Sequence, residues 1–188
     1  MYNLLKGKKG IIFGALDENS IAWKTAERVH EEGGTFVLTN APVALRMGKI
    51  NDLATACNTE VVPADATSME DLQNLFDIAT EKYGKLDFIL HSIGMSINVR
   101  KKKDYTDLNH EWMKKTMDIS AMSFHRVMQT AFKMDAMNEG ASILALTYIA
   151  GQRTFPGYGE MAEAKSMLES FARSFGYYYG VNKKVRVN

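Results

Sequence analysis

Short apolar runs alternate along the chain with longer stretches in which apolar residues recur at helical spacing. The runs cover residues 10–14, 35–39, 60–64, 86–92 and 140–149, and a sixth begins at 185–187. They are rich in β-branched and aromatic residues, which favours β-strands. Pro63 places the end of the third run at a sheet edge or a bend, because proline donates no ladder hydrogen bond. The alternation is typical of stacked βαβ units.

The helical stretches cover residues 20–32, 69–82, about 109–134 and 159–179. Ser20 is expected to cap the first of them. The runs 11–13 and 88–90 are almost wholly apolar, which suits strands of a parallel sheet that is covered on both faces. We therefore predict an α/β fold, with a doubly wound parallel sheet flanked by helices on both faces. A single domain is expected to span residues 1–188.

Composition and charge narrow the classes of partner. The 188 residues include 23 Lys and Arg against 22 Asp and Glu, so the overall charge gives no reason to expect nucleic acid or a membrane surface. Cys57 is the only cysteine, which excludes an internal disulfide and a multi-cysteine zinc site, and we expect no metal. The sequence shows no apolar run of membrane-spanning length and no signal peptide. A cytoplasmic location is expected.

Ligands of such sheets bind where the strands end, so the residues that follow the strands are the first candidates. After the first strand, Gly14 permits close approach to the backbone, and Ser20 and Ile21 begin a helix whose N–H groups attract phosphate. The segment is not a GxGxxG motif, and an ordinary strand-to-helix turn explains it equally well. Asp65, after the third strand, either accepts a hydrogen bond from an adenine amine or starts a turn.

The fourth strand is followed by Ser92, Ile93 and Gly94, small or apolar residues against which a flat cofactor is able to lie. His91, at the end of the strand, suggests acid-base catalysis. A single histidine that ends an apolar strand is more often a packed, hydrogen-bonded side chain, and we favour that interpretation.

Two tyrosines and a lysine follow the fifth strand. Tyr148 is expected to end this strand, Tyr158 lies beyond a loop with glycine and proline, and Lys165 lies two helical turns after Tyr158. An ammonium near a tyrosine stabilises its phenolate, as acid catalysis requires. Alternatively Tyr158 caps a helix and Lys165 is a surface charge, and the spacing alone does not decide between the two.

Taken together, these segments resemble the enoyl-acyl-carrier-protein reductases of type II fatty acid synthesis, within the short-chain dehydrogenase/reductase superfamily of Rossmann-like fold. Most of that superfamily places a tyrosine four residues before the lysine. Here that position is Met161, and the tyrosine is Tyr158. The longer spacing is the specific signal, and the resemblance runs through to Asn188.

The resemblance implies reduction of the trans-2-enoyl double bond of an acyl-carrier-protein thioester by hydride transfer from NADH, with NADPH not excluded. It implies cytoplasmic homotetramers built from dimers and an acyl carrier protein as partner. Ser96 would border the substrate, and Tyr148, Tyr158 and Lys165 would be catalytic. The cofactor would contact the following residues: Gly14, Ser20, Ile21, Asp65, Ala66, Ser92, Ile93, Gly94 and Lys165. A short-chain ketoreductase and a dinucleotide-binding module without catalysis are the alternatives.

The chain also departs from the family pattern. Residues 39–42 offer no acidic side chain for a ribose hydroxyl, and no Arg or Lys follows before Arg46, which favours NADH over NADPH. Glu160 and Glu163 stand where small or amide residues are expected. Family members continue beyond Asn188 with a substrate-covering segment, so we expect that segment to be missing from these residues and the fold to be cut short at its C-terminal end.

Two further surface features suggest interactions. The basic run Arg100–Lys103 falls in the loop after the fourth strand, so it is either a steering surface for an acidic carrier protein or a solvated loop. The stretches 109–134 and 159–179 carry many methionines and phenylalanines. Most of these are expected in the core, and the remainder would pair subunits.

Overall fold

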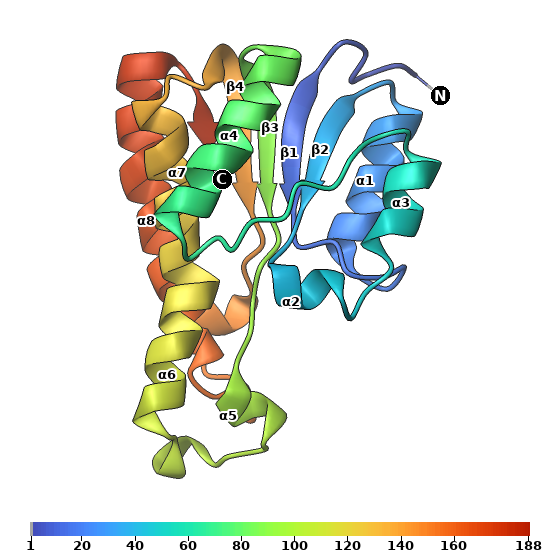
Figure 1. The fold of residues 1–188 in the computed structure, drawn as a ribbon. Coiled ribbons are helices and arrows are strands. Elements are labelled where there is room, and N and C mark those ends of the chain that lie inside the picture. The colour runs from blue at the N-terminus through green and yellow to red at the C-terminus, as the bar shows by residue number, and fades with distance from the viewer. Residues whose placement is uncertain (1) are drawn as a thin grey trace.

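The sheet has five parallel strands in the order β2-β1-β3-β4-β5. A computed structural model describes residues 2–188. The strands are β1 (Lys9–Phe13), β2 (Thr35–Thr39), β3 (Leu86–His91), β4 (Met137–Ala145) and β5 (Arg186–Val187). All five run the same way, toward the lower side of Figure 1. We call the side where they end the carboxyl edge. The direction of winding reverses between β1 and β3, which is where ligands of this topology bind.

Helices cover both faces of the sheet, which confirms the predicted fold class. One face packs through Ile12 and Leu38 against α1 (Ile21–Glu31) and α3 (Ile50–Ala56). The other packs through Ile11 and Ile143 against α4, α7 and α8, and Figure 1 shows α4 crossing in front of the strands. These three helices span Met69–Tyr83, Ser123–Lys133 and Met161–Lys183. Neighbouring strand residues point to opposite faces, so two apolar cores form from one set of strands.

The helix predicted over 109–134 is three consecutive segments. These are α6 (His110–Met117), a π-helical segment η2 (Asp118–Met122) and α7. The π-helical segment turns the Ser120 hydroxyl onto the backbone of Met95, accepting from its N–H at 3.0 Å and lying 3.2 Å from its carbonyl oxygen. Such widened turns occur mostly at functional sites. Here it ties the helix to the segment after β3.

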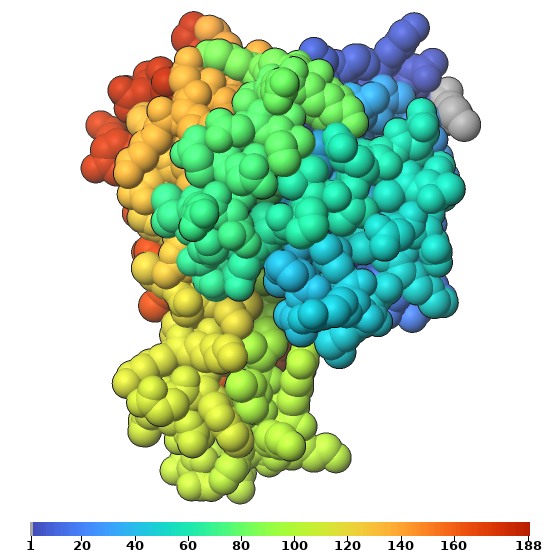
Figure 2. Space-filling view, in the orientation of Figure 1, coloured from blue at the N-terminus to red at the C-terminus, as the bar shows by residue number. Residues whose placement is uncertain are grey.

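Part of the chain extends beyond the carboxyl edge. It contains α5 (Ile97–Arg100), η1 (Tyr105–Asp107) and the start of α6. In Figure 2 these residues form a lobe that projects from the body of the molecule. This lobe therefore borders the carboxyl edge of the sheet on one side.

Three local predictions need correction. The third predicted strand, 60–64, is reduced to an isolated bridge between Val61 and Leu38. The N–H groups of Val62 and Ala64 still donate to Leu38 and Asn40 at 2.9 and 3.1 Å, so the segment lies beside β2 without forming a regular strand. The strand predicted over 140–149 is displaced to Met137–Ala145, so Tyr148 does not end it but precedes the 3-10 turn η3 (Ile149–Gly151). The short helices α2 (Pro42–Leu45), which begins with a proline, and α3 were not predicted.

In the described part of the chain, no helix combines the length and apolarity needed to cross a membrane. Within residues 2–188, no three side chains of metal-binding type gather at one point.

Candidate functional site

Gly14 brings the end of β1 against the segment after β3. Its φ is +90°, a conformation that L side chains rarely adopt. A Cβ at this position would fall 2.0 Å from the carbonyl oxygen of Ser92. Only glycine allows the two segments to approach so closely. At the switch point of the sheet the surface is therefore formed by backbone without a side chain. This is where the sequence placed the phosphate-binding turn.

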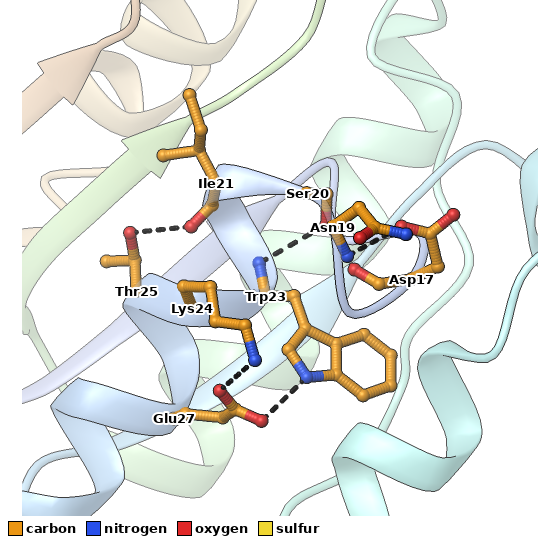
Figure 3. Close-up of polar contacts among 8 residues, drawn as sticks. All are labelled: Asp17, Asn19, Ser20, Ile21, Trp23, Lys24, Thr25 and Glu27. Atoms are coloured by element: carbon orange, nitrogen blue, oxygen red, sulfur yellow. Dashed lines mark hydrogen bonds and ion pairs between the residues drawn. The ribbon is translucent and has the colours of Figure 1, made fainter.

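The turn after Gly14 ends at the N-terminus of α1. The Ser20 hydroxyl accepts hydrogen bonds from the N–H groups of Leu16 and Trp23 and donates one to the carbonyl oxygen of Asp17 at 2.8 Å. Figure 3 shows this capped turn, with the Ile21 side chain pointing away from it. Ile21 is 63% exposed, and no acidic residue stands in the first turn of α1. The positive end of the helix is therefore not neutralised by its own side chains.

The segment after β3 meets α8 at Gly94. A Cβ on this exposed glycine would lie 3.4 Å from the Met161 Cε and 3.8 Å from the Lys165 Nζ. Ser92 and Ile93 are partly buried, and Ile93 packs on the core. The backbone here forms an open surface beside a lysine, as the flat-cofactor interpretation requires.

Lys165 is an interior lysine, not a surface charge. Its side chain is 6% exposed, and its Nζ donates to the carbonyl oxygen of Leu146 at 2.7 Å. Burial lowers the pKa of the ammonium. An ammonium has three donors, and the Leu146 carbonyl satisfies one of them. The surface-charge alternative is therefore excluded.

Tyr148 and Tyr158 lie side by side. Their ring centroids are 4.7 Å apart, and Phe155 packs on Tyr148 at 5.3 Å. Burial, and then the neighbouring Tyr148, raise the pKa of Tyr158 above its usual value. The sequence suggested that Lys165 would lower this pKa, but burial and Tyr148 are the influences on it in the structure. Tyr158 therefore remains a protonated hydroxyl at neutral pH, able to donate a hydrogen bond.

Three other predicted residues, Asp65, Ala66 and Ser96, are buried or hydrogen-bonded within the chain. Asp65 accepts hydrogen bonds from the N–H and the hydroxyl of Thr67, at 2.8 and 2.7 Å, so it does start a turn. Ala66 is buried. Ser96, predicted to border the substrate, is 5% exposed, and its hydroxyl points to Glu160.

His91 is a packed residue, as predicted. Its side chain is fully buried, and its Nε2 lies 2.9 Å from the Ser123 hydroxyl oxygen. Burial lowers its pKa to about 3, with a smaller contribution from Lys165. The imidazole is neutral at physiological pH and does not carry acid-base chemistry in this state.

Sequence reasoning missed a groove of about 860 Å³ next to the tyrosines. It lies between the loop that precedes η1, the loop around Gly157 and the first turns of α8. Its walls include the following residues: Lys103, Tyr105, Arg153, Phe155 and Glu163. Tyr105 donates a hydrogen bond to Glu163, which ties the lobe to α8. The groove combines segments 50 residues apart, so no local pattern announces it.

Comparisons with known proteins show the family of the chain. The model of a family described as "Enoyl-(Acyl carrier protein) reductase" matches residues 14–188. The chain belongs to this reductase family. A curated relative, enoyl-[acyl-carrier-protein] reductase [NADH] 2 of Rhizobium meliloti, is 33% identical in an alignment of 189 positions, which covers all of this chain and 69% of that protein.

Solved structures of the reductase family match the fold as well. FabI from Alistipes finegoldii is 63% identical, with a TM-score of 0.97 over all of this chain and 72% of that one. The FabI–NADH complex from the same organism gives the same identity and TM-score and is covered to 66%. The reductase [NADH] from Aquifex aeolicus is 32% identical with a TM-score of 0.88, over 98% of this chain and 73% of that one.

Proposed function

We propose that this chain reduces the trans-2-enoyl double bond of an acyl-carrier-protein thioester by hydride transfer from NADH, in fatty acid biosynthesis. The observation that carries the proposal is that the Gly94–Lys165 contact and the tyrosine pair both lie beyond the carboxyl edge of the sheet, in a chain of this family. Residues 1–188 contribute one dinucleotide-binding and catalytic domain. We place the reaction in the cytoplasm, a reducing compartment in which a free thiol such as the buried Cys57 is stable.

The residues at the carboxyl edge fit a dinucleotide. A side chain at Gly14 would collide with Ser92, so the backbone carries no side chain at this position. We propose that a pyrophosphate binds to this exposed backbone and to the N-terminus of α1. Exposed Ile21 offers apolar contact, Gly94 leaves room for a flat ring, and Lys165 is placed for ribose hydroxyls. When bound, NADH supplies the hydride. These assignments, with Asp65 and Ala66 beneath the adenine, are proposals.

Tyr158 has the properties of the hydrogen-bond donor that the reaction needs. Addition of hydride to the β-carbon of the enoyl thioester places negative charge on the thioester oxygen as an enolate. A fixed donor at that oxygen stabilises the transition state more than the ground state. The raised pKa of Tyr158 keeps its proton in place, and Tyr148 packs against its ring. We assign Tyr148 to the acyl end of the site, with Ser96 beneath it.

Turnover of two thioesters separates this function from the alternatives. With NADH in excess, crotonyl thioester should be reduced, while acetoacetyl thioester, a ketoreductase substrate, should not. Reduction of the keto substrate alone would favour the short-chain ketoreductase. Binding of NADH without turnover of either substrate by the complete gene product would favour the non-catalytic module.

An acidic acyl carrier protein is the proposed partner, and the basic run lies where it would dock. Arg100 ends α5, and Lys101 and Lys102 follow it, exposed on the projecting lobe. Lys103 pairs with Asp107 at 2.8 Å and lines the groove. The run therefore lies at one side of the groove, where positive charge attracts an acidic protein.

Reversal of Lys101, Lys102 and Lys103 to Glu should raise KM for the carrier-bound substrate by about 10-fold or more at low salt, and less at high salt. The KM for a small crotonyl thioester without a carrier protein should hardly change, because that substrate has no acidic protein surface to steer. A matched control reverses Lys6, Lys8 and Lys85, three exposed lysines near the opposite edge of the sheet. Equal effects on both substrates, or none, would make the run a solvated loop.

An apolar face on α7 and α8 is the proposed subunit interface. Most methionines and phenylalanines of these helices are buried or partly buried, but Tyr177, Tyr178 and Val181 are 66%, 57% and 66% exposed. A shallow hollow of about 240 Å³, lined by His125, Phe175 and Tyr178 among others, lies beside them. We propose homotetramers built from dimers that pair through this face.

Light scattering on the complete gene product should therefore give the mass of a tetramer. The double variant Tyr178→Asp, Val181→Asp should lower that mass, because charged side chains would be buried without partners. Met47→Asp, in the turn after α2 and 78% exposed, is the control and should leave the mass unchanged. A monomeric wild-type protein contradicts the proposal.

A further inference from the structure

Glu160 is a buried carboxylate at the base of the proposed site. Its side chain has no exposed surface, and the residue occupies the N-cap position of α8, two positions after Tyr158, without a capping hydrogen bond from its side chain. It is one of the two acidic residues that depart from the expected family pattern. Burial of a carboxylate costs free energy unless partners compensate it, so its presence calls for an explanation.

Two hydroxyl groups hold the carboxylate from two different elements. Ser96, at the start of α5, donates to the Glu160 Oε1 at 2.8 Å, and Thr116, on α6, donates to the same oxygen at 2.6 Å. Ser96 also accepts from the N–H of Val99 at 3.0 Å and so caps α5. Glu160 thus joins the segment after β3, α6 and α8 at one point.

These contacts keep the carboxylate ionised. Burial is the largest single influence and raises its pKa, but the hydrogen bonds from Thr116, Ser96, the Glu160 backbone and Asn98 together outweigh it, and the pKa is lowered overall. The N-terminus of α8 also favours negative charge. The second oxygen, Oε2, has no hydrogen-bond partner among the described residues. A neutral side chain would fill the same space without this cost, which indicates that the charge serves something beyond packing.

The turn that carries Tyr158 is packed closely on the same cluster. Gly159 has a φ of +50°, and a Cβ there would lie 3.1 Å from the Val99 Cγ2. Asn98 and Asn109 exchange two hydrogen bonds, at 3.1 and 3.0 Å, which fix α5 to the start of α6. The turn therefore packs on α5, the same short helix that Ser96 begins, and Tyr158 directly precedes Gly159.

We propose that Glu160 is a positioning residue for Tyr158: its buried carboxylate, held by Ser96 and Thr116, fixes the turn that carries the tyrosine against the segment after β3. The proposal rests on the proposed function, in which Tyr158 donates to the thioester oxygen. Glu160 itself acts only through Tyr158. Displacement of a catalytic group by about 1 Å is able to cost about 100-fold in rate.

Glu160→Gln tests the proposal because the amide has nearly the same shape and no charge. We expect kcat for crotonyl thioester to fall by about 10- to 100-fold with little change in KM for NADH. In a Tyr158→Phe background the same substitution should have little further effect, since the donor is already gone. An equal loss in both backgrounds, or a parallel rise in KM for NADH, would overturn the proposal. Glu139→Gln, an exposed carboxylate paired with Lys184, is the control.

Thr116→Val is the second variant, for use if Glu160→Gln does not fold. Valine keeps the shape of threonine but removes one donor to the carboxylate, so kcat should fall in the same direction. Thr116→Ser restores the hydroxyl and should restore kcat, which loss of packing does not predict. Equal kcat for the valine and wild-type proteins would overturn the proposal. Wild-type turnover is measured first, so its absence counts against the proposed function and not against Glu160.

Discussion

Tyr158→Phe should lower kcat by about 10- to 1000-fold with little change in the affinity for NADH. The substitution removes one oxygen atom and leaves the ring that packs 4.7 Å from Tyr148. The hydroxyl is needed only as charge develops on the thioester oxygen, so its loss should affect the transition state and not the binding of the cofactor. Steady-state kinetics on crotonyl thioester, with a calorimetric titration of NADH, measures both quantities.

Tyr148→Phe is the matched control for this prediction. Tyr148 is 36% exposed, and its role is to shape the acyl end of the site, so the loss of its hydroxyl should have the smaller effect on kcat. An unchanged kcat for the Tyr158 variant, together with a large loss for the Tyr148 variant, would move the donor role to Tyr148.

Lys165→Ala should weaken NADH binding by about 10- to 100-fold and lower turnover as well, because hydrogen bonds from a charged donor to the ribose hydroxyls would be lost. Lys165→Met is the better variant for the stability control, since it fills most of the space of a side chain that is 6% exposed. Thermal unfolding of both variants reports the loss of the Leu146 contact separately from cofactor binding.

Lys165→Arg should recover only part of the affinity, since the guanidinium restores the charge but not the compact geometry of the ammonium beside Gly94. Normal binding of NADH by Lys165→Ala in a calorimetric titration would contradict the assignment of Lys165 to the ribose.

The elements that could be predicted are those determined by local patterns. The run 35–39 is a strand over those same residues, and Ser20 caps α1 because its hydroxyl reaches the N–H of Trp23. The short strand β5 was visible as the run that begins at Val185. Apolar periodicity and capping chemistry act within a few residues, so the sequence displays them directly.

The features that escaped prediction depend on contacts between distant residues. The hydrogen bond between Ser96 and Glu160, 64 residues away, was not predicted, and the placement of Ser96 near the substrate stays a prediction. Burial and Tyr148 raise the pKa of Tyr158, whereas the sequence suggested that Lys165 would lower it. The strand predicted at 60–64 had the right composition, but the segment forms only an isolated bridge with β2. Tertiary packing decided each of these outcomes.

Transfer of deuterium tests the central claim most directly. NADH that carries deuterium at the transferred position of the nicotinamide is incubated with crotonyl thioester and the complete gene product, and the product is analysed by mass spectrometry and NMR. The account predicts butyryl thioester with one deuterium at the β-carbon. A product without deuterium there, or turnover confined to the keto substrate with deuterium on a carbinol carbon, would contradict it.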